Sequence, residues 1–248
     1  MTPRPRLGTS LLRLFTVQGS WTYEYMIGLG VGVAEEPLLR DLPGGPDGAA
    51  YHAAVARGAH FFNAHPYLAG LAVGATARAE HEGATPQQIE RLRAALAGPL
   101  GSLGDRLVWA GWLPFAAGLA LAGVALGLGW AAVAGFLVVY NAGHLVLRWW
   151  ALRAGWAHGT RVPTALHHPG LRRAAAFTAP AMAAALGLAW PLTAGYLAGP
   201  LAAGARLALA GGTALGMVLL WRRPANLTGL RLGLTLLAVG LVAGWVWR

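Results

Sequence analysis

The stretch LVWAGWLPFAAGLALAGVALGLGWAAVAGFLVVYNAGHLVL, at residues 107–147, decides the fold class of this chain. It holds 41 residues without a formal charge between Arg106 and Arg148. A helix needs about 20 apolar residues to cross a bilayer, so this run is long enough for two crossings. A second uncharged run, residues 174–205, adds 32 residues. The two runs predict a polytopic membrane protein.

The composition agrees with a membrane protein and excludes several kinds of site. Only 11% of the 248 residues are charged, whereas a soluble domain carries roughly a quarter. The chain has no cysteine, which excludes disulfides, zinc–thiolate sites and a cysteine nucleophile. All 19 basic residues are arginine, which excludes a Schiff-base lysine and the lysine of a phosphate-binding loop.

The positive charge of the chain indicates membrane topology rather than nucleic-acid binding. The net charge is +10, and all nine carboxylates lie at or before Asp105. Residues 107–248 contain ten arginines and no acidic residue, in short clusters between apolar runs. Such clusters are typical of cytoplasmic loops under the positive-inside rule. We therefore expect contact with membrane lipid and no nucleic-acid partner.

The chain divides near residue 106 into two parts. Residues 1–106 are expected to form a cytoplasm-facing and re-entrant helical half that carries polar motifs, and residues 107–248 a transmembrane half. Crossings are predicted at residues 107–127, 130–150, 174–192, 205–221 and 232–247. The expected fold is therefore all-α, with amphipathic or re-entrant N-terminal helices followed by about five transmembrane helices.

Helices are also predicted within the first half. One is expected over 7–34, with its basic start lying on the membrane surface, and another over 49–64, ending where Pro66 disfavours helical backbone. The apolar residues 67–77 are too few to cross a bilayer, which predicts a re-entrant or interfacial segment. Residues 86–97 read as a short amphipathic helix on the water side. The spacing of Gly70 and Gly74 suits close helix packing.

Polar side chains within apolar segments are expensive in a bilayer, so they are the first candidates for a functional site. The candidates fall into four groups: Gln18 with Trp21, Asn63 with His65, Asp105, and Asn141 with His144. Alternative roles remain open for three of the groups, and Gln18 with Trp21, taken alone, suits packing. Asp105 suits a helix cap, and Asn141 and His144, which share one helical face, suit hydrogen bonds to a neighbouring helix. Arg148, on that face, suits snorkelling to the interface.

Together the four groups suit a neutral, polyhydroxylated ligand. Amides, imidazoles and carboxylates supply the paired donors and acceptors that sugar hydroxyls need, and aromatic rings pack on the apolar face of a sugar. Transporters build such sites where helices break, because unwound backbone is tolerated only against protein or a wet cavity. We therefore expect the seven residues to bind substrate, without a metal or a cofactor.

Four motifs, in order, resemble a known family. They are QGSW at 18–21, FFNxHPY at 61–67, GPLxxxGD at 98–105 and NxxHLxxRxxxLRxG at 141–155. Together they are similar to the IID membrane subunit of the mannose/fructose/sorbose family of the bacterial phosphoenolpyruvate-dependent sugar phosphotransferase system. The resemblance covers roughly residues 10–155.

The resemblance implies a multi-pass subunit of a sugar permease in the bacterial inner membrane. It implies a IIC membrane partner, cytosolic IIA and IIB phosphocarrier subunits, a hexose substrate, and a higher oligomer of IIC–IID pairs. Phosphate would reach the sugar from a phosphohistidine on another chain, so no phosphorylated catalytic residue is expected here. The absence of cysteine agrees with that division of labour.

Two other functions remain open from the sequence. The region 160–206 is shorter than is typical of the family, which favours a non-transporting membrane scaffold or sensor that docks phosphocarrier proteins. A membrane-embedded enzyme would use His65 or His144 with Asp105. No spacing in the sequence fixes a base beside a nucleophile, so the enzyme is the weakest of the three hypotheses.

Overall fold

The structure, a computed structural model, describes residues 5–198, and every regular element in that range is a helix. The N-terminal part contains α1 (Leu7–Leu14), α2 (Gly28–Leu39), the 3-10 helix η1 (Gly45–Asp47), α3 (Ala49–Gly58) and α4 (Ala69–His81). It is followed by α5 (Pro86–Gly104), the π-helix η2 (Asp105–Trp112), α6 (Leu113–Ala125), α7 (Trp130–His158), the 3-10 helix η3 (Gly159–His167) and α8 (Pro169–Ala198). The predicted all-α class is confirmed for this part of the chain.

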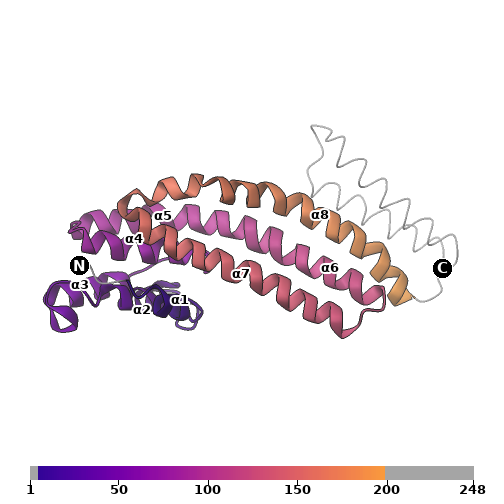
Figure 1. Cartoon of the computed structure of the whole chain (residues 1–248), viewed down its shortest axis with the longest axis horizontal. Coiled ribbons are helices and arrows are strands. Elements are labelled where there is room, and N and C mark those ends of the chain that lie inside the picture. Colours follow the sequence, from indigo (N-terminus) through magenta and orange to yellow (C-terminus); the bar gives the residue numbers. More distant parts are fainter. Residues whose placement is uncertain (1–4, 199–248) are drawn as a thin grey trace.

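Helices α6, α7 and α8 run side by side along the long axis of the molecule, and α1 to α4 gather at one end of them (Figure 1). Two helical runs, Pro86–Ala125 and Trp130–His167, are long and apolar enough to cross a membrane. Between them, Gly127 and Gly129 adopt the left-handed φ values of +87° and +50° that glycine tolerates. The second and third predicted crossings fall within Trp130–His167 and α8, the first extends two residues beyond Ala125, and the last two lie outside the described residues.

The prediction of one helix over 7–34 is wrong. Helix α1 ends at Leu14 and α2 begins only at Gly28, and the chain between them makes turns that fold α1 back onto α2. The close approach depends on Gly30, where an added Cβ would overlap the backbone of Val17. Apolar residues that become buried lie on both sides of the break. The pattern of apolar residues therefore does not indicate where the helix ends.

The prediction of a helix over 49–64 is correct only for its first part. Helix α3 ends at Gly58, and residues 59–68 form an irregular segment that carries the FFNxHPY motif. The short apolar segment predicted at 67–77 is α4, which is buried along its whole length from 69 to 77. Burial on every side explains why it contains so few polar residues.

Helix α4 packs tightly on α7 through small residues. A Cβ added at Gly70 would lie 3.1 Å from the Leu152 amide nitrogen, and one at Gly74 would lie 2.5 Å from the Leu152 carbonyl oxygen and the Trp156 amide nitrogen. Gly155 on α7 likewise faces the α4 backbone. The close packing predicted from the spacing of Gly70 and Gly74 is confirmed.

The predicted water-side helix and the first predicted crossing form one continuous rod. A capping box starts α5: the Thr85 hydroxyl accepts from the Gln88 amide, and the Thr85 amide donates to the Gln88 side chain. The rod continues through η2, whose wide turns precede Pro114, a residue that removes a helical N–H and clashes with the carbonyl four positions earlier. Asp105 has helical angles inside the rod, so it does not cap a helix start.

Candidate functional site

A polar cavity of about 450 Å³ lies where three stretches of the chain meet. Turns between α1 and α2, the segment between α3 and α4, and the α5–η2 junction supply its walls. The lining residues are Gln18, Trp21, Ile27, Asn63, Ala64, His65, Pro66, Ala97, Gly98, Gly101, Ser102 and Asp105. The volume falls within the range of about 300–1,000 Å³ that is typical of small-molecule sites.

The irregular segment before α4 is held to the turn before α2 by two backbone hydrogen bonds. The Phe62 amide donates to the Tyr25 carbonyl at 3.2 Å, and the Ile27 amide donates to the Phe62 carbonyl at 3.1 Å. Between these partners, Met26 has a φ of +51°, a left-handed conformation that costs energy in a residue other than glycine. The surrounding contacts therefore fix the backbone beside Asn63.

His65 places a neutral donor at the edge of the polar cavity. Its Nδ1 accepts from the Tyr67 amide at 3.2 Å, so Nε2 carries the proton, and burial lowers the pKa of His65 to about 4. Its Nε2 has no hydrogen-bond partner among the described residues. A buried donor without a partner is costly, so this atom is placed to gain a hydrogen bond that residues 5–198 do not supply.

The other polar groups at the cavity are accessible to a ligand. Gln18, Asn63 and Asp105 have exposed side chains, and Trp21 is 46% exposed, with its ring edge-on to Tyr23 at 4.8 Å. An amide, a carboxylate and an aromatic ring thus face one space. Within residues 5–198 no group of three or more His, Asp and Glu side chains is placed to hold a metal ion.

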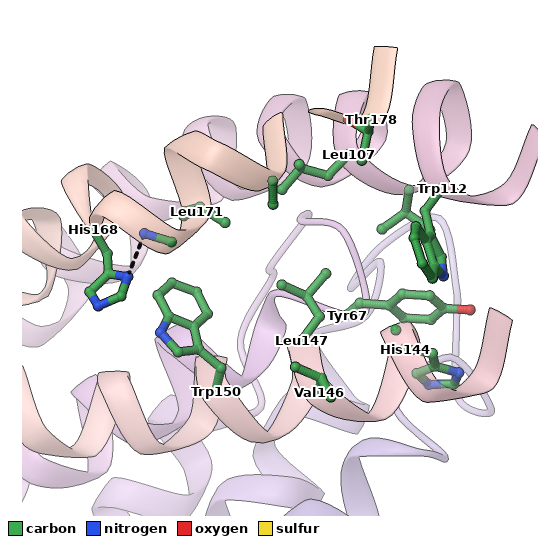
Figure 2. A pocket seen from close by; sticks show the side chains of 14 residues that line it. Tyr67, Leu107, Trp112, His144, Val146, Leu147, Trp150, His168, Leu171 and Thr178 are labelled. Carbon is green, nitrogen blue, oxygen red and sulfur yellow. Dashed lines mark hydrogen bonds between the residues drawn. The ribbon is translucent and has the colours of Figure 1, made fainter. Parts of the chain in front are cut away.

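A second cavity, of about 370 Å³, is apolar and lies between α7 and α8 (Figure 2). The π-helix η2 supplies a third wall through Leu107, Val108 and Trp112. Its lining residues are Tyr67, Leu107, Val108, Trp112, Gly143, His144, Val146, Leu147, Trp150, His168, Gly170, Leu171, Ala174 and Thr178.

Aromatic rings connect the linings of the two cavities. His65, in the polar lining, meets Tyr67, in the apolar lining, edge-on at 5.0 Å. Tyr67 also stacks on His144 with ring centroids 4.1 Å apart, and its hydroxyl lies 2.6 Å from that of Tyr140. Trp109 lies 5.3 Å from His65 on the η2 side. The cavities are therefore separated by a packed aromatic layer.

Arg148 does not snorkel to the interface, and that prediction is wrong. The residue is 3% exposed and its guanidinium lies over the rings of Phe15 and Tyr67. It donates to the Leu14 carbonyl at the end of α1 and, at 2.6 Å, to His144 Nε2. The Leu14 carbonyl accepts a long turn hydrogen bond from the Val17 amide at 3.4 Å and can accept a second donor, which Arg148 supplies.

The structure brings together five of the seven predicted site residues. Gln18, Trp21, Asn63, His65 and Asp105 line the polar cavity. His144 lines the apolar cavity and contacts the polar one only through Tyr67 and His65. Asn141 lines neither of the two cavities, because it lies exposed on α7 and donates to its own helix, at the Leu137 carbonyl, at 2.7 Å.

Sequence reasoning missed Arg93 near the polar cavity. The residue was expected on the water side, yet it is 4% exposed. The available signal was its helical register: Arg93 shares one face of α5 with Ile89, Leu96 and Leu100, all of which are buried. An arginine in the middle of an apolar face indicates a buried partner.

Comparison with known proteins identifies the family. A profile described as PTS system mannose/fructose/sorbose family IID component matches residues 4–190. The mannose-specific EIID component of Escherichia coli (strain K12) is 29% identical over 157 residues, covering 60% of this chain and 53% of that protein. The sorbose-specific EIID component of Klebsiella pneumoniae is 31% identical over 165 residues, covering 63% and 58%. The chain thus spans somewhat more than half the length of these relatives.

Solved structures agree with this result. A chain in the cryo-EM structure of the mannose transporter ManYZ with microcin E492 (MceA) is 25% identical, with a TM-score of 0.57 over 73% of this chain and 67% of that one. A second match, described as a membrane protein, has a TM-score of 0.67 over 97% and 95% but only 22% identity, and supports the fold alone. Because the profile extends over most of the chain, this protein belongs to the mannose/fructose/sorbose family of phosphotransferase-system IID components.

Proposed function

We propose that this chain is the IID subunit of a sugar permease in the bacterial inner membrane. It crosses the membrane several times, forms the translocation unit with a IIC partner, and assembles into a higher oligomer of IIC–IID pairs. Cytosolic IIA and IIB subunits phosphorylate the arriving hexose, which is of the mannose, fructose or sorbose type. Phosphorylation traps the sugar inside the cell and drives net uptake.

One observation carries the proposal: Gln18, Trp21, Asn63, His65 and Asp105, from distant parts of the sequence, line one polar cavity. The carboxylate accepts, the His65 Nε2–H donates, and the Gln18 and Asn63 amides do both, which matches the alternating needs of sugar hydroxyls. Trp21 supplies the ring on which the apolar face of a sugar packs.

His65 supports this role most directly. Its pKa of about 4 keeps the imidazole neutral at cytoplasmic pH, so it presents one fixed donor and no charge. A buried cation would be expensive to maintain, so a neutral donor suits a buried position beside a neutral ligand. The Nε2–H, which the described residues leave unpaired, is buried, so a sugar hydroxyl would satisfy it once a small side-chain shift opens this atom to the cavity.

The test is phosphoenolpyruvate-dependent uptake of mannose, fructose and sorbose in cells that co-express this chain with its chromosomal neighbours. Asp105→Ala removes a charged acceptor, so we expect uptake to fall about tenfold or more. Asn63→Ala removes neutral hydrogen bonds, so we expect a smaller loss. Asp47→Ala is the matched control, because Asp47 is exposed in η1 and lines neither cavity.

Wild-type uptake in both Asn63→Ala and Asp105→Ala would contradict the proposal and favour a scaffold or sensor. The same cells also test the expected partner. This chain is purified from their membranes in mild detergent, and the purified material is examined for a IIC subunit. Its absence from the purified material would contradict the expected translocation unit.

A further inference from the structure

Arg93 lies directly behind the polar cavity. It projects from the face of α5 that also carries Ala97 and Gly101, one and two helical turns later, and both of these residues line the cavity. The side chain itself is 5% exposed and lines neither cavity. Arg93 is therefore close to the site without access to a ligand.

The guanidinium of Arg93 contacts the irregular segment that carries Asn63 and His65. Its Nη2 donates to the His60 carbonyl at 3.0 Å, and its plane lies over the Phe62 ring at 5.1 Å. His60 and Phe62 lie three residues and one residue before Asn63 in the sequence. The segment has no helical hydrogen bonds of its own at this point, so the backbone of His60 depends on Arg93 for a donor.

Arg93 is itself held by a buried carboxylate. Glu35, on α2, is 2% exposed, and its Oε2 lies 3.9 Å from Arg93 Nη1. The other oxygen of Glu35 accepts from the Thr76 hydroxyl at 2.6 Å, which ties α2 to α4. Glu35 Oε2 and Arg93 Nη1 have no hydrogen-bond partner among the described residues.

An apolar side chain would fill the place of Arg93 at a lower desolvation cost, because buried ion pairs repay that cost poorly. Methionine there would still pack against Phe62, but it would leave the His60 carbonyl without its donor. The contact that distinguishes arginine from an apolar residue at this position is therefore the hydrogen bond to the irregular segment.

We propose that Arg93 is a positioning residue of the polar cavity: by holding the His60 carbonyl, it fixes the segment that presents Asn63 and His65 to the ligand. The inference rests on the proposed sugar-binding role of the cavity. Arg93 does not touch the sugar. It acts on sugar affinity through the backbone, and phosphoryl transfer on the cytosolic subunits is independent of it.

The test compares Arg93→Met with Arg93→Lys in cells that co-express the chromosomal neighbours. For mannose, fructose or sorbose, whichever the wild type transports, we expect Arg93→Met to raise KM about tenfold. The maximal rate per inserted protein should stay within about twofold of wild type. Arg93→Lys, whose ammonium also donates to the His60 carbonyl, should recover much of the lost affinity.

Arg57→Met is the matched control. Arg57 pairs with Glu80 at 2.7 Å, both side chains are largely buried, and the pair joins α3 to α4 without lining either cavity. We expect it to lower the Tm without changing KM. An Arg93→Met variant that lowers the Tm and leaves KM at the wild-type value, as the control does, overturns the inference.

Two further variants keep the test decisive. Should Arg93→Met fail to insert because Glu35 loses its counter-charge, the double variant Glu35→Gln/Arg93→Met removes both charges, and its KM is compared with that of Glu35→Gln alone. Asn63→Ala separates the two proposals. If Asn63→Ala loses uptake while the Arg93 variants keep the wild-type KM, only the positioning role is overturned. If Asn63→Ala and the Arg93 variants all behave as the wild type, the proposed sugar-binding role of the cavity is overturned as well.

Discussion

Replacing Glu35 by glutamine should stabilise the protein at alkaline pH, although the change removes one partner of a buried ion pair. Burial raises the pKa of Glu35 from its usual 4.5 to about 7, against the opposing effects of Arg93 and Thr76. The pair is weak because the closest oxygen and nitrogen lie 3.9 Å apart without a hydrogen bond. Glutamine keeps an oxygen that accepts from Thr76 and resembles the protonated carboxyl.

The magnitude follows from the change in pKa. Moving a pKa from 4.5 to about 7 is worth about 3 kcal/mol, since each tenfold change in proton affinity is worth about 1.4 kcal/mol. Below pH 4.5 the carboxyl is protonated in both the folded and the unfolded chain. Between 4.5 and 7 the unfolded chain releases the proton first, so the free energy of unfolding falls as the pH rises. Above pH 7 the carboxyl is ionised in both states, and the full loss in the free energy of unfolding is present.

Thermal unfolding in detergent between pH 5 and pH 8 measures this effect. Other groups titrate in both proteins, so the difference between the Tm curves of wild type and Glu35→Gln isolates the carboxyl. At pH 8 we expect a variant that is more stable by roughly 6–12 °C for a domain of this size, and at pH 5, where the unfolded chain has already released most of the proton, about a quarter of that difference. A variant that is less stable than wild type at pH 8 would refute the reasoning and show that the ion pair outweighs the desolvation of Glu35.

Two further substitutions test the packing of the N-terminal part. Gly74→Val should destabilise the chain by about 1–3 kcal/mol, because its Cβ would lie 2.5 Å from α7 backbone atoms. Gly135→Ala, with open space around its Cβ, should raise the Tm slightly, and a Gly74→Val variant with the wild-type Tm would contradict the packing. Arg148→Met should release α1 from α7, since the Leu14 carbonyl loses its donor, and hydrogen exchange in residues 7–20 should accelerate. Arg153→Met, an exposed neighbour on α7, is the control, and equal exchange in both variants would refute the role of Arg148.

The two long apolar helical runs could be predicted from the sequence because length and composition indicate them. The uncharged run of 41 residues is long enough for two crossings, and most of it lies in the two helical runs that are long and apolar enough to cross a membrane. The N-terminal helices were harder to delimit because their ends depend on contacts between distant residues. The break after Leu14 is set by the packing of Gly30 on Val17, and nothing local to α1 signals it.

The position of the Arg148 side chain was also difficult to predict, because it too depends on contacts between distant residues. An arginine near the end of a long apolar helix ordinarily reaches for water, and no residue near Arg148 in the sequence indicates otherwise. The fold places the end of α1 beside α7, so the Leu14 carbonyl and the rings of Phe15 and Tyr67 offer the guanidinium a better environment. That partner lies 134 residues away in the sequence.

The polar residues that line the polar cavity differ from Asn141 in the hydrogen-bond partners that lie near them in the sequence. Asn141 sits in a regular helix, and its Nδ2 donates to the carbonyl four residues earlier. Asn63 and His65 lie in an irregular segment where no such carbonyl is available. Asp105 lies in a helical rod, but a carboxylate only accepts, so the carbonyls of its own helix cannot satisfy it. A site is therefore better predicted from helix breaks and from acceptors within helices than from polarity alone.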